Sequence, residues 1–185
     1  SIPIFIEAPY ILKLWLVEVP EYSVIFLRLV LLITLVDSLS YTLITSVHAS
    51  GKVKWYQIIN GSVLLLTLPI VYIVLYMGMK PYMAMVISLI MSIICLFVRL
   101  AVISKTINFP IGKFVKNVIF TVIIVSLFSF VPIWYLYKFL NDSFLSFMIV
   151  SITSVLLSLV VSLFVALSSS ERGIIFKIIL QKIRK

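Results

Sequence analysis

The chain alternates long apolar runs with short connections that carry most of its charge. Five runs, each of about twenty residues or more, occupy positions 22–48, 55–78, 82–104, 117–139 and 143–168. At ~1.5 Å of rise per residue, each run is long enough as a helix to cross a hydrocarbon core of ~30 Å. Because backbone groups in lipid must bond within their own segment, we expect all five runs to be helical.

This pattern predicts an all-α fold, a polytopic bundle of five membrane-spanning helices over residues 22–168. Residues 1–21 are expected to hold the end of a preceding membrane segment and an external connection. The chain opens on Ser1 followed by apolar residues, which indicates a C-terminal piece of a longer protein. In the basic tail, residues 169–185, we interpret Lys177, Gln181, Arg184 and Lys185 as one helical face, opposed by Ile174, Ile175, Ile178 and Ile179. Such a pattern is typical of an amphipathic helix lying in the lipid headgroups.

The composition is typical of a membrane-embedded chain. Hydrophobic residues make up 63% of it and charged residues 11%, which leaves no room for a sizeable water-soluble domain. Cys95 is the single cysteine and His48 the single histidine. No disulfide or thiolate metal cluster can therefore form within the chain, and we expect neither a metal nor a cofactor.

The net charge of +9 is distributed unevenly over the connections. One set of alternate connections, together with the tail and with Arg99 near the end of the third run, holds eleven Lys and Arg residues. The other set, together with Lys138 at the end of the fourth run, holds three. The positive-inside rule places the eleven, and with them the C-terminus, in the cytoplasm. The basic charge is then an orientation signal and a contact with anionic membrane lipids, so we expect lipids rather than nucleic acid as partners.

The first run contains a stripe of polar residues with an ionisable group at its centre. Residues spaced three or four apart share one face of a helix, and here they are Thr34, Asp37, Ser38, Tyr41, Thr45 and His48. Asp37 is a candidate coupling-ion or proton site, or an acceptor for sugar hydroxyls. The alternative, which the sequence leaves open, is an interhelical hydrogen bond that fixes the packing.

Arg28 lies in the same run, nine residues before Asp37, which places it ~13 Å away on the opposite face. It either extends to the outer headgroups or binds an anion in an outward-facing cavity, since a guanidinium fork suits phosphate. The hypothetical substrate cavity is therefore lined by Arg28, Asp37, Ser38, Tyr41 and Thr45.

A second group of polar residues lies at the predicted cytoplasmic ends of the second and third runs. One hypothesis is that this group lines a cytoplasmic entrance. Its members are then Lys52, Lys54, Gln57, Asn60 and Arg99. The alternatives are simpler: Arg99 as an anchor at the inner boundary, and the two amides as partners for backbone groups of the connection.

Three further features bear on packing. Four serines spaced three or four apart on the last run are typical of close helix contacts: Ser151, Ser154, Ser158 and Ser162. Pro69 and Pro132 lie inside runs and are expected to kink their helices. The segment 105–116, which contains Pro110 and Gly112, is expected to lie in the membrane interface.

No constellation typical of an enzyme is present in the sequence. There is no Ser/His/Asp set and no pair of carboxylates, and the Gly51-Lys52 pair lacks the flanking residues of a phosphate-binding loop. We therefore expect no catalytic residues and no enzyme active site within this chain.

Two stretches resemble a known family of transporters. Residues 11–22, ILKLWLVEVPEY, and residues 49–57, ASGKVKWYQ, followed by LPIVY at 68–72, are similar to Wzx-type oligosaccharide flippases. These belong to the multidrug/oligosaccharidyl-lipid/polysaccharide exporter superfamily. The resemblance covers roughly residues 11–99. Relatives often have Gly where this chain has Val17, and Thr where it has Ser50.

The resemblance implies a complete protein of twelve to fourteen helices in two bundles, with a further N-terminal bundle as the partner of this chain. It implies transport of undecaprenyl-pyrophosphate-linked oligosaccharide to the outer leaflet of a bacterial inner membrane by alternating access, for surface polysaccharide such as O-antigen. The alternatives are a drug or cation antiporter of the same superfamily, a membrane enzyme of polysaccharide assembly, and a purely structural subunit.

Overall fold

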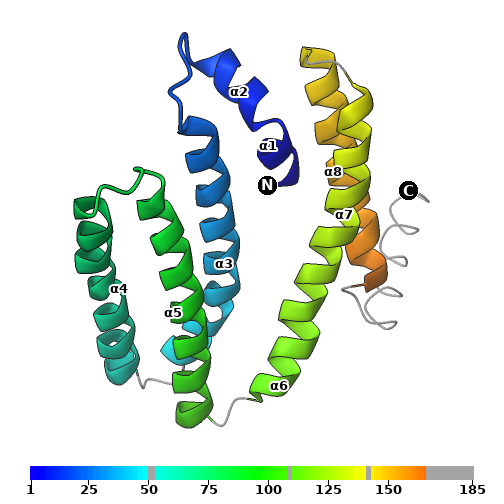
Figure 1. The fold of residues 1–185 in the computed structure, drawn as a ribbon. Coiled ribbons are helices and arrows are strands. Elements are labelled where there is room, and N and C mark those ends of the chain that lie inside the picture. Colours follow the sequence, from blue (N-terminus) through cyan, green and yellow to red (C-terminus); the bar gives the residue numbers. More distant parts are fainter. Residues whose placement is uncertain (50–52, 108–109, 141–142, 166–185) are drawn as a thin grey trace. The chain divides into compact units, whose positions relative to one another are not determined.

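The computed structural model describes residues 1–49, 53–107, 110–140 and 143–165, and these are helical with short turns and no strand (Figure 1). Five of the helical segments are long and apolar enough to cross a membrane: Ser23–Thr45, Tyr56–Tyr76, Met83–Lys105, Ile111–Phe139 and Phe144–Val165. The prediction of an all-α, multi-pass bundle is confirmed. The expected amphipathic helix over 169–185 lies outside the described residues.

The described residues form two compact units. Ser1 and Pro3–Phe114 belong to the first unit, and Ile2 and the described residues from Val115 to Val165 belong to the second.

The first unit opens with two short helices, α1 (Ile2–Ile6) and α2 (Ala8–Trp15). Each has a proline in its first turn, where the missing backbone N–H costs nothing. The chain turns between them at Glu7, which is 1% exposed although the sequence suggested an external connection there. Helix α2 packs against the next helix, α3.

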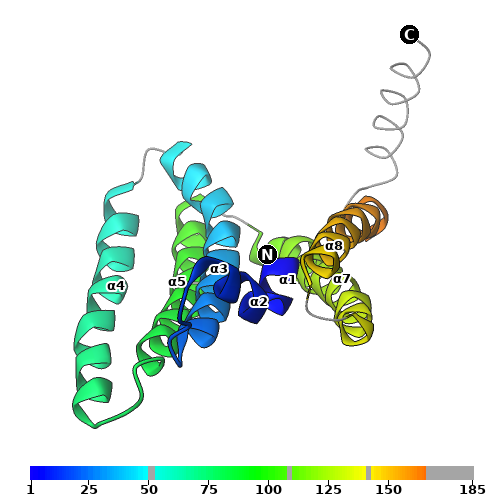
Figure 2. The ribbon, with the colours of Figure 1, turned by 90° about the horizontal axis from the view of Figure 1, so that it is seen from above.

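Helix α5 (Met83–Ile107) is the centre of the first unit, with α3 (Ser23–Ala49) on one side and α4 (Val53–Tyr76) on the other (Figure 1, Figure 2). Helices α3 and α4 each pack along α5, but they contact one another at only a few positions. The buried side chains of α5 follow a helical repeat and are Met91, Cys95, Leu96, Arg99, Leu100 and Ile103. The core of this unit therefore lies along α5.

Two tyrosines show that α3 and α5 begin at the same end of the unit. Tyr22 and Tyr82 each lie just before their helix, and their ring centroids are 5.7 Å apart. Both were assigned from the sequence to the outer aromatic belt. A hydrogen bond with the neighbouring Glu21 side chain is the main cause that raises the pKa of Tyr22, so this phenol remains a protonated donor at neutral pH.

Helix α4 ends at Tyr76, and Gly78 in its C-terminal cap has a φ of +77°. The N–H of Gly78 donates to the carbonyl of Leu75 at 3.0 Å, and the N–H of Met79 donates to that of Val74 at 3.4 Å. These two bonds form the left-handed C-terminal cap in which glycine is preferred, and they satisfy carbonyls that the helix leaves unpaired. Pro69 lies inside α4, as predicted.

The second unit contains a π-helical turn, Val115–Ile119, followed by α7 (Phe120–Phe139) and α8 (Phe144–Val165). The short helix α6 (Ile111–Phe114) precedes the π turn. Helix α6, the π turn and α7 together make up the fourth candidate span. The sequence predicted that residues 105–116 lie in the membrane interface, between two spans. Much of this segment is helical, because α5 continues to Ile107 and helix resumes at Ile111.

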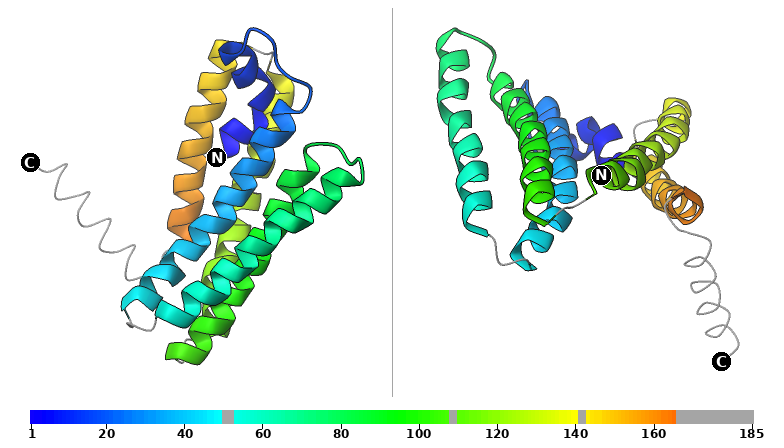
Figure 3. Two further views of the ribbon diagram at one scale, coloured as in Figure 1. Left: turned by 90° about the vertical axis from the view of Figure 1, so that its left-hand side faces the viewer. Right: turned by 90° about the horizontal axis from the view of Figure 1, so that it is seen from below.

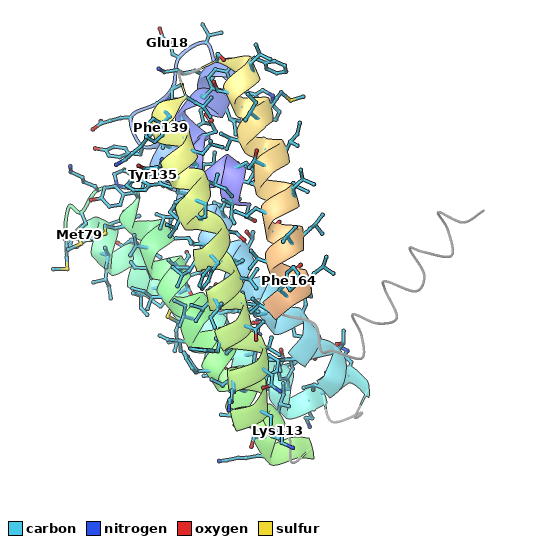
Figure 4. All side chains as sticks on the ribbon, turned by 90° about the vertical axis from the view of Figure 1, so that its right-hand side faces the viewer. Glu18, Met79, Lys113, Tyr135, Phe139 and Phe164 are labelled. Atoms are coloured by element: carbon cyan, nitrogen blue, oxygen red, sulfur yellow. The ribbon has the colours of Figure 1, made fainter. Side chains whose placement is uncertain are left out.

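Helices α7 and α8 pack along one another. The buried positions of α8 recur every four residues at Ser146, Val150 and Ser154. Of the four serines that the sequence suggested for close helix contacts, Ser154 is buried, whereas Ser151, Ser158 and Ser162 are only half-buried. At the end of α7 that leads to α8, Tyr135 and Phe139 contact edge to face with centroids 5.1 Å apart (Figure 4). Phe164 lies towards the opposite end of α8.

The cap at Gly78 can be tested by paired alanine substitutions. Gly78→Ala is expected to lower the free energy of unfolding by about 1 kcal/mol, because a Cβ disfavours the positive φ. Gly61→Ala is the matched control: it lies inside α4, its added Cβ meets nothing within 4 Å, and it is expected to be neutral or stabilising. Unfolding in mixed detergent micelles measures both. Equal effects of the two substitutions would contradict the assigned cap.

Candidate functional site

The polar stripe predicted on the first span lies on α3 and is largely uncovered in the described part of the chain. Thr34, Ser38, Tyr41 and Thr45 are exposed, with Tyr41 at 67%, and Asp37 is half-buried. The neighbouring face of α3 is closed, because Ser40, Leu43 and Val47 are buried. One helix thus has an apolar packing face and, beside it, an open polar face in the middle of a candidate span.

The polar side chains of this stripe are of two kinds: hydroxyls that bond to the backbone of their own helix, and longer or charged groups that cannot. Thr34 Oγ1 donates to the Leu31 carbonyl at 2.9 Å, and Ser38 Oγ donates to the Leu35 carbonyl at 2.7 Å. Hydroxyls bonded to their own helix are tolerated in lipid. The carboxylate of Asp37 accepts only, and the Tyr41 phenol is too long to reach its own backbone. These two side chains therefore require water or polar partners.

Arg28 lies away from this stripe. Its Nε donates to the carbonyl of Phe5 at 3.1 Å, and its guanidinium lies 5.4 Å from the centroid of the Phe5 ring. The arginine is thereby held at the end of α1, where helix carbonyls favour a positive charge. Nine residues of helix turn it to the side of α3 opposite Asp37. The structure therefore brings four of the five hypothetical cavity residues to one face, and Arg28 to another.

Asn60 and Arg99, two of the residues proposed to line an entrance, do come together. The Nε of Arg99 donates to Asn60 Oδ1 at 2.8 Å, which joins α5 to α4. Arg99 is only 9% exposed, which disagrees with the alternative of an anchor reaching into the headgroups. Lys54 and Gln57 are exposed. Lys52 lies outside the described residues.

Tyr56 completes this second site and is not among the candidate residues that the sequence analysis selected. It is 4% exposed, and its hydroxyl is buried without a hydrogen-bond partner. The charge of Arg99 and the thiol of Cys95 both act electrostatically on this hydroxyl. The sequence spacing could have revealed this site, because residues four apart share one face of a helix. Tyr56 and Asn60 have this spacing on α4, and Cys95 and Arg99 have it on α5.

Asp37 connects the two features. The carboxylate acts electrostatically on the thiol of Cys95, so the edge of the α3 stripe lies near the buried polar cluster on α5. Among the described residues, no three His, Cys, Asp or Glu side chains come together as a metal site would require.

The arrangement defines a polytopic helical membrane protein with an open polar face on α3 and a closed basic cluster between α4 and α5. A comparison with known proteins finds no match to this chain among protein-family models, curated protein sequences or solved structures.

The Asn60–Arg99 bond makes a specific prediction for stability. Asn60→Ala is expected to lower the free energy of unfolding by about 1.5–3 kcal/mol, because it leaves a buried guanidinium without its acceptor. Gln57→Ala, an exposed amide less than one turn earlier on α4, is the control and is expected to change stability by less than about 0.5 kcal/mol. Unfolding curves in mixed micelles give both values. Equal, small effects would show that the bond contributes nothing.

Proposed function

We propose that this protein is part of a transporter that moves lipid-linked oligosaccharide, carried on undecaprenyl pyrophosphate, to the outer leaflet of a bacterial inner membrane. The observation that carries the proposal is the open polar face of α3, formed by Thr34, Asp37, Ser38, Tyr41 and Thr45 within a candidate span. The similarity of residues 11–22 and 49–57 to Wzx-type flippases points to the same class.

A sugar headgroup crossing a membrane requires a hydrated surface rich in hydrogen-bonding groups. The α3 face offers a carboxylate that accepts from sugar hydroxyls, a phenol that can donate or accept, and hydroxyl oxygens with free acceptor capacity. An open face also suits a large substrate, since the described helices leave its centre uncovered. Arg28, held on the other side of α3, would act on the pyrophosphate only in a different, outward-facing state.

Alternating access supplies the movement in this proposal. Pro69 in α4 and Pro132 in α7 each remove a backbone donor inside a candidate span, which allows a helix to bend. Bending of individual helices would expose the α3 face first to the cytoplasm and then to the outside.

A second candidate function is favoured by Asp37. A half-buried carboxylate inside a candidate span is the group that a drug or cation antiporter uses to bind its cargo or coupling ion. This candidate shares the architecture and differs in the charge of the substrate.

The test is a functional rescue in a strain that lacks its own O-antigen flippase. Expression of the full-length protein is expected to restore long-chain surface polysaccharide. Absence of rescue, with the protein present in the membrane, would contradict the flippase proposal. Resistance of the same cells to cationic dyes would then favour the antiporter.

Substitutions on the α3 face sharpen the rescue. Asp37→Asn, Asp37→Ala and Tyr41→Phe are expected to reduce polysaccharide by about tenfold or more, the effect of losing one hydrogen bond with a charged or polar headgroup. Tyr72→Phe is the control, because Tyr72 is 70% exposed on α4 and lies outside the stripe. Arg28→Ala tests the proposed outward-facing role. If polysaccharide is unchanged in all the α3 variants at equal expression, these residues take no part in transport.

A further inference from the structure

The cluster between α4 and α5 contains a buried positive charge that forms no ion pair among the described residues, although the Asp37 carboxylate acts on the neighbouring Cys95 thiol. Arg99 is 9% exposed, and its hydrogen bond goes to the neutral amide of Asn60. Among the described residues, no carboxylate forms an ion pair with it. Burial of an unpaired guanidinium is costly, and buried charges are almost always paired. An anion in direct contact with the guanidinium of Arg99 would offset this cost.

Tyr56 supports the same conclusion independently. Its hydroxyl is buried and makes no hydrogen bond, although it lies within the electrostatic range of Arg99. Serines in the same helices bond to their own backbone: Ser62 Oγ donates to the Ile58 carbonyl at 2.8 Å, and Ser88 Oγ to the Ala84 carbonyl at 2.9 Å. A phenol cannot reach its own helix in this way. An acceptor placed beside Tyr56 and Arg99 would satisfy both groups.

The cluster lies within two helical turns of the ends of its candidate spans. Tyr56 is the first residue of its candidate span, and Asn60 lies ~6 Å deeper along α4. Arg99 lies ~9 Å before Lys105, the last residue of its span. A phosphate at the edge of the hydrocarbon core would be within reach of the long arginine side chain and of the phenol.

The surroundings of the cluster attract anions. The C-terminal ends of α3 and α5 and the N-terminal end of α4 lie at the same end of the first unit (Figure 3). This end carries exposed basic or titratable side chains at His48, Lys54 and Lys105. Basic groups at a membrane surface concentrate anionic lipids beside it.

We propose that Tyr56 and Arg99 bind the phosphate of an anionic phospholipid at this end of the first unit. The terminal nitrogens of Arg99 and the Tyr56 hydroxyl donate to the phosphate oxygens, and Asn60 is a positioning residue that orients the guanidinium through Nε. The site is distinct from the α3 stripe, so it stands whether or not the protein transports oligosaccharide.

The experiment uses the full chain in nanodiscs of phosphatidylcholine, with or without phosphatidylglycerol. Thermal unfolding and native mass spectrometry measure the lipid-dependent stabilisation and the number of retained anionic lipids. We expect phosphatidylglycerol to raise the unfolding temperature of the wild-type protein and to remain bound.

Two variants keep the fold and remove the site. Tyr56→Phe deletes only the unpaired hydroxyl, so in phosphatidylcholine its stability is expected to equal or exceed that of the wild type, while phosphatidylglycerol binds about tenfold more weakly. Asn60→Asp supplies a counter-charge to Arg99 and is expected to abolish the stabilisation by phosphatidylglycerol. The controls are Tyr72→Phe, an exposed phenol on α4, and Lys105→Gln, an exposed charge on α5, and both are expected to retain it.

Three outcomes would overturn the proposal. Full stabilisation by phosphatidylglycerol in both Tyr56→Phe and Asn60→Asp would show that no phosphate binds here. Loss of the effect in Lys105→Gln, with Tyr56→Phe unchanged, would show a general surface-charge effect. Equal stabilisation by inorganic phosphate in phosphatidylcholine discs would show that the site takes free phosphate rather than a lipid.

Discussion

The absence of water in the hydrocarbon core is the constraint on which this structure depends. Every backbone group there must bond within the protein, which is why the described chain is helical throughout its spans. The same constraint acts on side chains, and several hydroxyls, such as those of Thr34, Ser88 and Ser162, donate to carbonyls of their own helix. Asp37, Tyr56 and Arg99 cannot satisfy themselves in this way. These three residues therefore indicate where the protein meets something other than lipid chains.

The two polar features differ in how open they are, and the difference follows from the central position of α5. Because α3 and α4 pack on α5 rather than on one another, the α3 stripe lies to the side of the packing contact and stays uncovered. The cluster of Tyr56, Asn60 and Arg99 lies in the contact itself and is closed. An open face suits a large hydrated substrate, whereas the closed cluster suits contact with a single charged group.

The sequence predicted the five spans because hydropathy over twenty residues depends on the solvent and not on the neighbours of each helix. It did not predict which helix is central, since these helices are apolar on nearly all sides and give no direction to their packing. Asp37 was identified because a carboxylate is rare inside a span. Tyr56 was missed because a tyrosine near a span end is typical of the headgroup boundary, and only the packing of α5 against α4 shows that it is buried.

The hydrogen bond between Arg99 and Asn60 has a consequence for how this sequence can change over time. The two residues are 39 positions apart, yet each is the reason that the other is tolerated in a closed contact. By contrast, the serines that bond to their own helix can be exchanged singly for alanine, since no second side chain depends on them. Divergence should therefore accumulate freely at the serines, while positions 60 and 99 are expected to change together or not at all.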